Sequence, residues 1–167
     1  MANVWFCSDL HFGHKKIGGF RYGYADSEEA NRKRISDDWR KSVTKRDIVY
    51  VLGDACFTMD TVEDFKNLPG KKILIRGNHD LLDTQVYLKY FESVFGLLKY
   101  KEFWLSHAPI HPIELRGKIN LHGHVHYNSI SDNRYFNCCP ENLWPNFKNS
   151  LISLDQVRKY INESSSR

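Results

Sequence analysis

The sequence predicts an α/β fold in which short buried strands alternate with helices. The first observation is a series of short apolar runs that end in polar or glycine-rich turns: NVWFCSD, DIVYVLGD, KKILIRGNHD, EFWLSHAP and KINLHGHVH. Continuous runs of β-branched and aromatic residues are typical of strands that are covered on both faces. The second observation is a stretch of helical periodicity between the first two runs. For a chain of 167 residues, we expect one domain that spans residues 1–167.

The segment SEEANRKRISDDWRKSVTKRD, residues 27–47, predicts the first helix. Ser27 can cap it, and Glu28 and Glu29 give its first turn the negative charge that a helix N-terminus favours. The residues that fall at helical spacing are Ala30 or Asn31, Ile35, Trp39 and Val43. Shorter helices are expected for TVEDFKNL and for SLDQVRKYI, which is followed by a frayed tail, ESSSR. The segment LLKYKEFWL predicts a tight hairpin with Lys101 near its turn.

The composition is that of a soluble globular protein. Hydrophobic residues make up 41% of the chain and charged residues 26%, and no run approaches the ~18 apolar residues of a membrane span. The N-terminus lacks the features of a signal peptide. The four cysteines form no C-x-x-C pair, which disfavours a structural zinc site and a disulfide framework. We therefore expect a cytoplasmic protein with reduced thiols and no membrane partner.

The charge of the chain gives a weak indication about partners. A net charge of +4 tolerates a phosphate-rich partner without requiring one. The cationic residues of the predicted 27–47 helix are diluted by Glu29, Asp37 and Asp38, and the apolar stripe leaves them on the solvated face. A nucleic-acid partner is therefore not favoured.

Polar residues follow directly after the predicted strands. They are Asp9 and His11, Asp54, Asn78 with His79 and Asp80, His107, and His124 with His126. Each alone has a structural explanation, such as a helix cap or a turn. In open α/β sheets, however, ligands bind beyond the carboxyl ends of the strands, so these loops would deliver their side chains to one place. Together they indicate a functional site.

The segment INLHGHVHY has His122, His124 and His126 at every second position. In an extended segment such side chains point to the same side, where three imidazoles would crowd together; a metal ion resolves this crowding. Carboxylates, an amide oxygen and imidazoles without thiolates suit manganese, iron or zinc. The candidates are too many for one tetrahedral ion. Two ions about 3.5 to 4 Å apart that share a carboxylate would use them all.

This motif series resembles that of the calcineurin-like metallophosphoesterase superfamily. The superfamily pattern is D-x-H, G-D, G-N-H-D/E, a lone His and G-H-x-H. The matching segments, in the same order, are Asp9-Leu10-His11, Gly53-Asp54, Gly77-Asn78-His79-Asp80, His107 within SHAP, and Gly123-His124-Val125-His126. The stretch SDLHFGHKKI is most similar to the start of small stand-alone bacterial and phage phosphoesterases.

The resemblance implies a four-layer α-β-β-α sandwich with two mixed β-sheets and a centre of two divalent metal ions. Manganese is the preferred ion, with iron, zinc or nickel as alternatives. The resemblance assigns Asp9, His11 and His126 to the first ion, Asn78, His107 and His124 to the second, and Asp54 to a bridge between them. It also implies that a metal-bound hydroxide attacks phosphorus in line. His79, oriented by Asp80, would protonate the leaving oxygen as general acid.

Several residues near the motifs have two interpretations each. His14 is expected either to contact the substrate phosphate or to be an ordinary surface histidine. Arg76 could neutralise a phosphate oxygen or pair with an acidic neighbour. His122, outside the G-H-x-H motif, is expected in a supporting or packing role. The aromatic residues Phe12, Phe57 and Tyr127 could stack on a base, although core packing is favoured for Phe12 and Phe57.

The chain departs from the protein phosphatases of the superfamily at one position. Their G-D motif continues as D-R-G, whereas this chain reads Gly53-Asp54-Ala55-Cys56-Phe57. Without that arginine a dianionic phosphomonoester loses a clamp, and a phosphodiester carries one charge fewer. We therefore predict a phosphodiesterase that acts on a small or nucleotide-like phosphodiester. The alternatives are a phosphomonoesterase, a nuclease that accepts strand ends, and a metal-bound scaffold without catalysis; the oligomeric state is left open.

Overall fold

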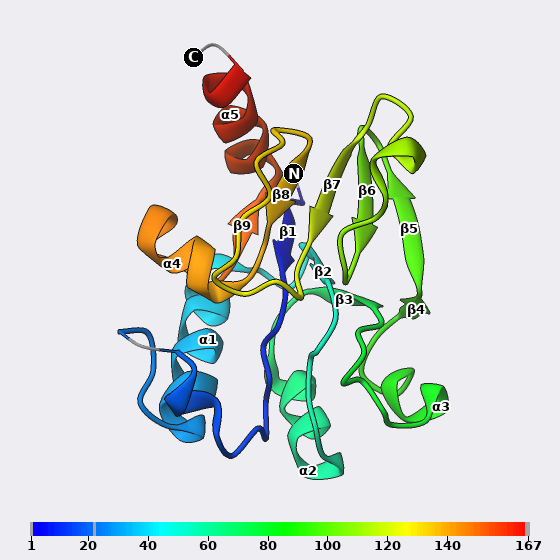
Figure 1. The fold of residues 1–167 in the computed structure, drawn as a ribbon. Coiled ribbons are helices and arrows are strands. Elements are labelled where there is room, and N and C mark those ends of the chain that lie inside the picture. The colour runs from blue at the N-terminus through cyan, green and yellow to red at the C-terminus, as the bar shows by residue number, and fades with distance from the viewer. Residues whose placement is uncertain (1, 22, 166–167) are drawn as a thin grey trace.

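The computed structural model describes residues 2–21 and 23–165, which form two β-sheets with helices around them (Figure 1). The first sheet has the order β4-β3-β2-β1-β9, with bounds Ser93–Phe95, Lys71–Ile75, Ile48–Val51, Val4–Cys7 and Ile152–Ser153. The second has the order β5-β6-β7-β8, with bounds Leu97–Tyr100, Phe103–Ser106, Ile119–His122 and Tyr135–Asn137. Both sheets are mixed, because β9 is antiparallel to β1 and β5 is antiparallel to β6, while the other pairs are parallel. The predicted arrangement of two mixed sheets with helices is confirmed.

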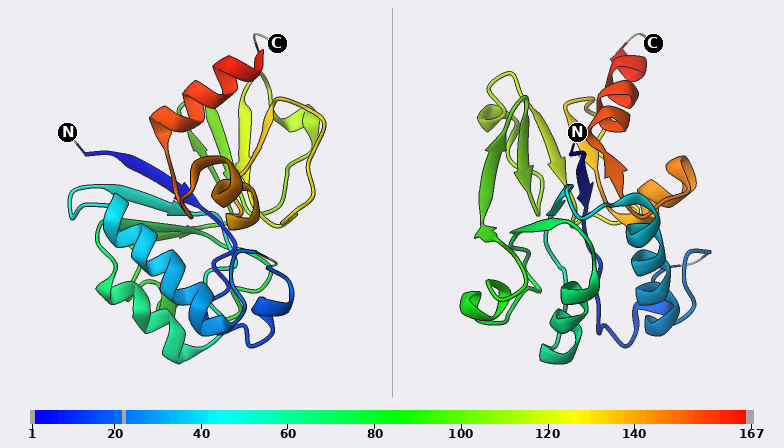
Figure 2. Two further views of the ribbon diagram at one scale, coloured as in Figure 1. Left: turned by 90° about the vertical axis from the view of Figure 1, so that its left-hand side faces the viewer. Right: turned by 180° about the vertical axis from the view of Figure 1, so that it is seen from behind.

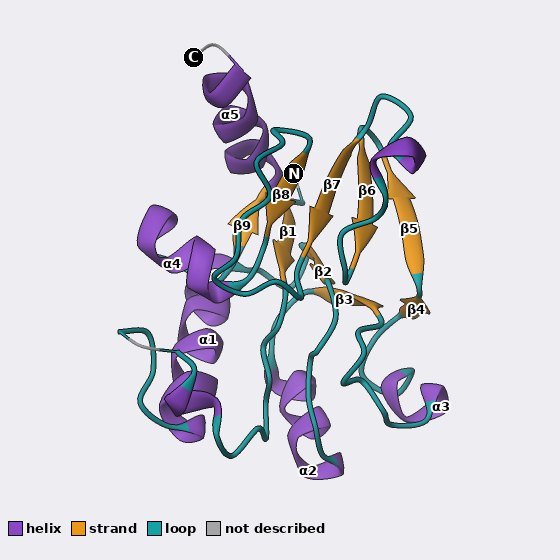
Figure 3. Ribbon diagram, viewed as in Figure 1, coloured by secondary structure: helices purple, strands orange, loops and turns teal. Residues whose placement is uncertain are grey.

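The helices of the described residues are short apart from the first and the last (Figure 3). The α-helices are α1 (Glu28–Ser42), α2 (Met59–Val62), α3 (Thr84–Tyr87), α4 (Pro140–Phe147) and α5 (Leu154–Ser165). The 3-10 helices are η1 (Ile17–Gly19), η2 (Glu63–Asn67) and η3 (Pro112–Glu114). The sequence patterns did not indicate α3 and α4, nor the two- or three-residue strands β4, β8 and β9.

The first predicted helix is confirmed in its start and in its buried face. The Ser27 hydroxyl accepts a hydrogen bond from the Ala30 amide at 3.1 Å, as expected for an N-cap. Ile35 and Trp39 are fully buried, and the Trp39 indole donates to the Pro69 carbonyl at 2.8 Å. The hairpin is also confirmed, since β5 pairs with β6 across a turn in which Lys101 has a φ of 50°.

All three predicted helices differ from the structure at an end, and the first stops at Ser42, short of the expected residue 47. The segment TVEDFKNL forms one turn of α-helix and then the 3-10 helix η2, and the helix begins earlier than expected because Thr58 and Thr61 form a capping box. Helix α5 continues through Ser165, whereas the sequence predicts a frayed tail that begins at residue 163. The Ser164 hydroxyl donates to the Tyr160 carbonyl at 2.8 Å, which satisfies a helix-end acceptor. Residues 166 and 167 of the expected tail lie outside the described residues.

Two apolar cores separate the layers. Helices α1 and α2 cover the outer face of the first sheet (Figure 2), where Trp39 and Phe65 pack against Val49 and Leu74. The second core lies between the sheets; Phe6 from the first sheet meets Phe103 from the second at a ring-centroid distance of 6.4 Å. Burial of these aromatic side chains supplies the main driving force for stacking the two sheets.

The segment after β6 covers the outer face of the second sheet. The Trp104 indole donates to the Leu115 carbonyl at 3.3 Å, and the Tyr135 hydroxyl donates to the Ile110 carbonyl at 2.7 Å. This layer therefore consists of a loop with the short helix η3, and α4 and α5 contribute Leu143 and Val157 to the core between the sheets. None of the described helices combines the length and apolar character needed to cross a membrane.

The topology brings the carboxyl ends of several strands together. Strands β1, β2 and β3 are parallel neighbours in the first sheet, and β6 and β7 are parallel neighbours in the second. In Figure 3 the arrowheads of β1, β6 and β7 point in the same direction, toward the loops that carry the motif residues. The predicted site residues thus converge from two sheets.

Candidate metal centre

The loops that follow the strands are tied to one another by backbone hydrogen bonds. The amides of Asp9 and His11 donate to the carbonyls of Gly53 and Asp54, each at 2.9 Å, so the loops after β1 and β2 run side by side. The Gly123 amide donates to the His107 carbonyl at 2.8 Å, which joins the loops after β6 and β7 in the second sheet. Each motif is therefore fixed against a motif from the neighbouring strand.

The backbone at the motif residues is held in the left-handed region. Eight described non-glycine residues have a positive φ, and five of these are predicted metal ligands. They are Asp9, His11 and Asp54 with φ of 52°, His124 with 69° and His126 with 51°. Such conformations cost roughly 1–3 kcal/mol each for non-glycine residues and cluster at functional sites, where the surrounding fold maintains them.

A first group of ligand atoms surrounds the Asp9 carboxylate. Atom Oδ1 of Asp9 lies 3.5 Å from His11 Nε2 and 3.5 Å from His126 Nε2. Atom Oδ2 of Asp54 lies 3.7 Å from the same His11 nitrogen. Asp9, His11 and Asp54 are all buried, and their ligand atoms lie within 4.8 Å of one another. These atoms are close enough together to coordinate one cation.

The two oxygens of Asp9 have different surroundings. Atom Oδ2 accepts hydrogen bonds from the Ser8 hydroxyl at 2.5 Å, the His124 amide at 2.8 Å and the Cys139 thiol at 3.2 Å. Atom Oδ1 and both ring nitrogens of His11 are buried and have no hydrogen-bond partner among the described residues. Unsatisfied buried polar atoms are unfavourable, and a cation among them would satisfy them. The donor set therefore fits a metal ion.

A second group of ligand atoms surrounds His107. Its Nε2 lies 2.8 Å from Asn78 Oδ1, 3.2 Å from His124 Nδ1 and 3.4 Å from Asp54 Oδ2. Asn78 and His124 are exposed, so this group opens to solvent. The same Asp54 oxygen faces both groups, which is the position that a bridging carboxylate requires. Oxygen and imidazole donors fit a second divalent ion.

Carbonyl and carboxylate groups outside the two ligand groups orient the imidazoles. His107 Nδ1 donates to the Leu52 carbonyl at 2.9 Å, which leaves the lone pair of Nε2 available in the neutral ring. His126 Nδ1 lies 2.9 Å from Glu141 Oε1, so its Nε2 is likewise free to coordinate. Such pairing of a histidine with a carboxylate is common in metal sites.

In the metal-free cluster the carboxylates and the imidazoles shift each other's pKa. Burial alone raises the pKa of Asp9, but the neighbouring His11, His107 and His126 outweigh it and hold that pKa well below its usual range. Burial lowers the pKa of His107, but Asp54 and Asp9 overcome this effect and raise it to about 9. Protonated imidazoles thus neutralise the carboxylates when no metal is bound, and a divalent cation would replace those protons.

The three histidines at every second position do not lie on one extended segment. Strand β7 ends at His122, which is buried with its Nδ1 2.9 Å from the Gly123 carbonyl oxygen. His124 and His126 lie beyond the strand, in left-handed conformations that send one ring to His107 and the other to Asp9. The expectation of same-side crowding is therefore wrong, although both of these rings reach the ligand groups.

His79 and His14 lie beside the first ligand group. The His79 ring stacks on Phe57 at a centroid distance of 5.2 Å and lies 6.0 Å from the His11 ring. His79 is exposed to solvent, and its amide donates to Asp54 Oδ1 at 2.8 Å. The His14 ring lies 5.6 Å from the His11 ring and 4.9 Å from Phe57. Both histidines are thus positioned to contact a molecule bound at the cluster.

The expectation that Asp80 orients the His79 ring is wrong. The buried Asp80 carboxylate accepts three backbone hydrogen bonds at 2.8 Å, from the amides of Asp54, Ala55 and Gly77. Burial raises the pKa of Asp80, while these amides favour its charged form. Asp80 therefore fastens the GNHD loop to the loop after β2, and its effect on His79 is through the backbone.

The expectation that Arg76 pairs with an acidic neighbour is wrong, because all three guanidinium nitrogens donate to neutral oxygens of the segment 80–84. Nε donates to the Asp80 carbonyl at 2.8 Å, Nη1 to the Thr84 hydroxyl at 3.0 Å and Nη2 to the Leu82 carbonyl at 2.7 Å. These bonds go to two carbonyls and a hydroxyl and to no acidic side chain, and they use three of the five guanidinium N–H groups. Arg76 holds the segment 80–84 in place.

Sequence reasoning missed a buried network behind the cluster. Arg21 is fully buried; its Nε donates to Glu141 Oε1 at 2.9 Å, its Nη1 to Asn31 Oδ1 at 2.5 Å, and its Nη2 to the Asp9 carbonyl. Asn31 in turn donates to the Leu10 carbonyl at 2.9 Å. The network supports the backbone of the D-x-H motif and, through Glu141, the ring of His126. In the sequence, Arg21 and Glu141 are isolated charged residues. No sequence pattern distinguishes them from charged residues on the surface.

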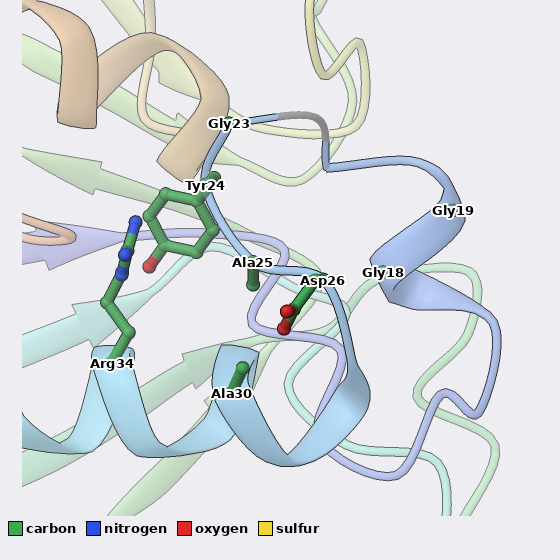
Figure 4. A pocket seen from close by; sticks show the side chains of 8 residues that line it. All are labelled: Gly18, Gly19, Gly23, Tyr24, Ala25, Asp26, Ala30 and Arg34. Atoms are coloured by element: carbon green, nitrogen blue, oxygen red, sulfur yellow. The ribbon is translucent and has the colours of Figure 1, made fainter.

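Two hollows flank the cluster. One of about 320 Å³ is lined by His11, His14, Ile17, Phe20, His79, His126 and Tyr127. The other, of about 560 Å³, lies on the side of Asn78, His107 and His124 and has walls that include Leu97, Pro109 and Ile110. A third hollow of about 470 Å³ lies beside α1, where Arg34 lies next to Tyr24 (Figure 4), and it contains none of the predicted ligands. The first two are therefore the candidates for binding a substrate at the cluster.

The comparison with known proteins agrees with this architecture. The sequence model of the calcineurin-like phosphoesterase family matches residues 2–160. The chain belongs to the calcineurin-like phosphoesterase family. Membership of this family, together with the clustered ligand atoms, supports a metal-dependent hydrolase of phosphoric esters.

Relatives of this calcineurin-like phosphoesterase occur in phages, archaea and bacteria. The gene 66 proteins of Mycobacterium phages D29 and L5 are each 28% identical, over 98% and 97% of this chain and 98% and 95% of theirs. An uncharacterized protein of Methanocaldococcus jannaschii is 30% identical over 82% of this chain and 77% of its own. The crystal structure of a protein of unknown function from Aquifex aeolicus is similar with a TM-score of 0.72 at 25% identity, covering 96% of this chain and all of that one. This chain therefore covers nearly the whole length of both phage relatives.

Gly123→Ala is expected to disrupt the cluster. A Cβ atom at this position would lie 1.7 Å from Ser8 Oγ and 2.1 Å from Asp9 Oδ2, so the loop after β7 must move away from Asp9. We expect a loss of about 1–3 kcal/mol in the free energy of unfolding and a clear decrease in bound metal after dialysis against manganese. Gly96→Ala is the matched control, because its Cβ would meet no atom within 4 Å. Equal metal content in the two variants would contradict this account.

Glu141→Gln is expected to weaken metal binding and also to lower the free energy of unfolding, because it leaves the buried Arg21 without its charged partner. Glutamine keeps the shape of the side chain but removes the charge that orients the His126 ring, and the loss of such a partner typically costs about 10- to 100-fold in metal affinity. Isothermal titration with manganese measures the effect, and circular dichroism checks the fold. The exposed Glu114→Gln variant is the control. An affinity at the wild-type level in Glu141→Gln would show that the carboxylate does not act on the metal site.

Proposed function

We propose that the protein is a dinuclear-metal-dependent phosphodiesterase that hydrolyses a small or nucleotide-like phosphodiester. Asp9, His11 and His126 would hold one divalent ion, and Asn78, His107 and His124 the other, with Asp54 shared between them. Manganese is the proposed ion. When bound, the pair of ions supplies an activated water and Lewis acidity toward the phosphoryl oxygens.

The observation that carries the proposal is the position of Asp54 Oδ2 between two groups of ligand atoms. It lies 3.7 Å from His11 Nε2 on one side and 3.4 Å from His107 Nε2 on the other. Its second oxygen, Oδ1, accepts the His79 amide at 2.8 Å, which fixes the rotation of the carboxylate. A carboxylate held in this way supports two adjacent cation sites better than a single one.

His79 is the proposed general acid. Its ring is exposed beside the first ligand group, and stacking on Phe57 fixes the plane of the ring. In the proposed reaction the oxygen of water forms a new bond to phosphorus, and a proton of that water passes to solvent. The bond to the leaving oxygen breaks, and His79 gives this oxygen its proton, which His79 then regains from solvent. The products are a phosphomonoester and an alcohol.

Two features support a diester substrate. One hollow is lined by His11 and His126 and the other by Asn78, His107 and His124, so the two offer room for two ester substituents. Of the described residues that line these hollows, Arg76 alone is an arginine or lysine, and its guanidinium is engaged by Asp80, Leu82 and Thr84. A monoanionic diester requires less positive charge than a dianionic monoester.

The buried, unpaired cysteines support the proposed cytoplasmic location, where thiols stay reduced.

The test is hydrolysis by metal-stripped protein to which manganese, nickel, zinc or magnesium is added back in turn. We expect manganese to restore activity, with bis(4-nitrophenyl) phosphate cleaved at a higher kcat/KM than 4-nitrophenyl phosphate. Release of 4-nitrophenolate is followed by its absorbance. A preference for the monoester would favour a phosphomonoesterase, and two bound ions without any turnover would favour a non-catalytic scaffold.

His79→Ala is expected to lower kcat about 100-fold or more with little change in bound metal, because positioned proton transfer contributes about 10²- to 10⁴-fold. The decrease should be larger for a phenyl ester than for a 4-nitrophenyl ester, since phenol is the weaker acid and its oxygen needs the proton more. His111→Ala, at an exposed histidine in η3's N-cap, is the control. An equal decrease of kcat for both esters would show that His79 is not the general acid.

A further inference from the structure

The hollow that contains His79 has an unusual wall. Phe20 and Tyr127 line it and remain 60% and 57% exposed, although both are large and largely apolar. They come from segments that are far apart in the chain, one after η1 and the other directly after the G-H-x-H motif. Exposed aromatic side chains that face one hollow are typical of a surface that a ligand covers.

A series of ring contacts connects this wall with the reacting end of the hollow. The Phe20 ring lies 5.9 Å from His14, the His14 ring lies 4.9 Å from Phe57, and Phe57 stacks on His79 at 5.2 Å. The hollow is thus bounded by aromatic faces and edges from its rim to the proposed acid. A planar ring is the group that such a wall binds best, because stacking is worth about 1–3 kcal/mol per base. Tyr127 adds a hydroxyl that can hydrogen-bond to a polar ring edge.

The position of His79 gives the hollow a direction. Among the described residues, His79 lines this hollow and not the hollow bounded by Leu97, Pro109 and Ile110. The acid must reach the oxygen that leaves phosphorus, so the leaving alcohol lies on the side of Phe20 and Tyr127. The ester substituent that stays on phosphorus then lies on the other side, toward Ile110.

From this geometry we infer that the hollow lined by Phe20 and Tyr127 is the leaving-group subsite of the enzyme. Its ligand is a planar aromatic ring carried by the leaving alcohol, as in a nucleoside. The hollow of about 320 Å³ lies within the range of small-molecule pockets, about 300–1,000 Å³. This inference rests on the proposed phosphodiesterase function and adds the orientation of the substrate.

The test uses two diesters that share a leaving group. Bis(4-nitrophenyl) phosphate and methyl 4-nitrophenyl phosphate both release 4-nitrophenol, and they differ in the substituent that stays on phosphorus. Phe20→Ala and Tyr127→Ala are each expected to lower kcat/KM about fivefold or more, by the same factor for both substrates. Ile110→Ala is expected to lower kcat/KM several-fold for the bis-aryl ester alone. Ile113→Ala, 71% exposed in η3, is the control and changes neither value.

A binding measurement that does not depend on turnover accompanies the kinetics. Equilibrium dialysis of 4-nitrophenol against metal-free wild type and Phe20→Ala is expected to show about fivefold weaker binding to the variant. Unchanged kinetics and binding in both Phe20→Ala and Tyr127→Ala would overturn the subsite. A decrease of kcat/KM in Phe20→Ala for the bis-aryl ester alone would overturn the proposed orientation of the substrate. The hollow would then hold the substituent that stays on phosphorus. Failure of the wild type to cleave either diester would instead count against the proposed function.

Discussion

The candidate metal centre depends on the three hydrogen bonds that Asp9 Oδ2 accepts. The donors come from the end of β1, from the loop after β7 and from the start of α4, and they are Ser8, His124 and Cys139. These bonds connect the first sheet to the second and turn Oδ1 toward the imidazoles. The close approach of Gly123 is part of the same constraint, because any side chain there would separate the two sheets at this point.

The sequence predicts the parts of the structure that depend on local patterns. The five strand candidates, the capped helix α1 and the hairpin around Lys101 all follow from periodicity, capping and turn chemistry over a few residues. Strands β4, β8 and β9 have two or three residues each, which is too short to produce a period. They exist because a neighbouring strand offers hydrogen-bond partners, and a local pattern contains no information about that neighbour.

The same division applies to the site. The candidate ligands could be predicted because each follows a strand, and parallel strands end at the same edge. The partners of Arg21 could not, since Glu141 is 120 residues away in the chain and the pairing depends on burial. The roles of Asp80 and Arg76 differ from the predicted ones for a related reason. Both lie within the motif region, but Asp80 binds backbone amides and Arg76 binds backbone carbonyls, and these contacts depend on the folded loops rather than on the local sequence.

The left-handed backbone at five of the proposed ligands has a consequence for the energetics of ion capture. A loop that had to adopt these conformations on binding would lose conformational entropy at that moment and would bind more weakly. Here the hydrogen bonds of the neighbouring loops already hold Asp9, His11 and Asp54 in place. The free-energy cost of the left-handed conformations is thus met during folding, and the centre is preorganised. A cation that enters it has to displace protons and water but does not have to change the backbone conformation.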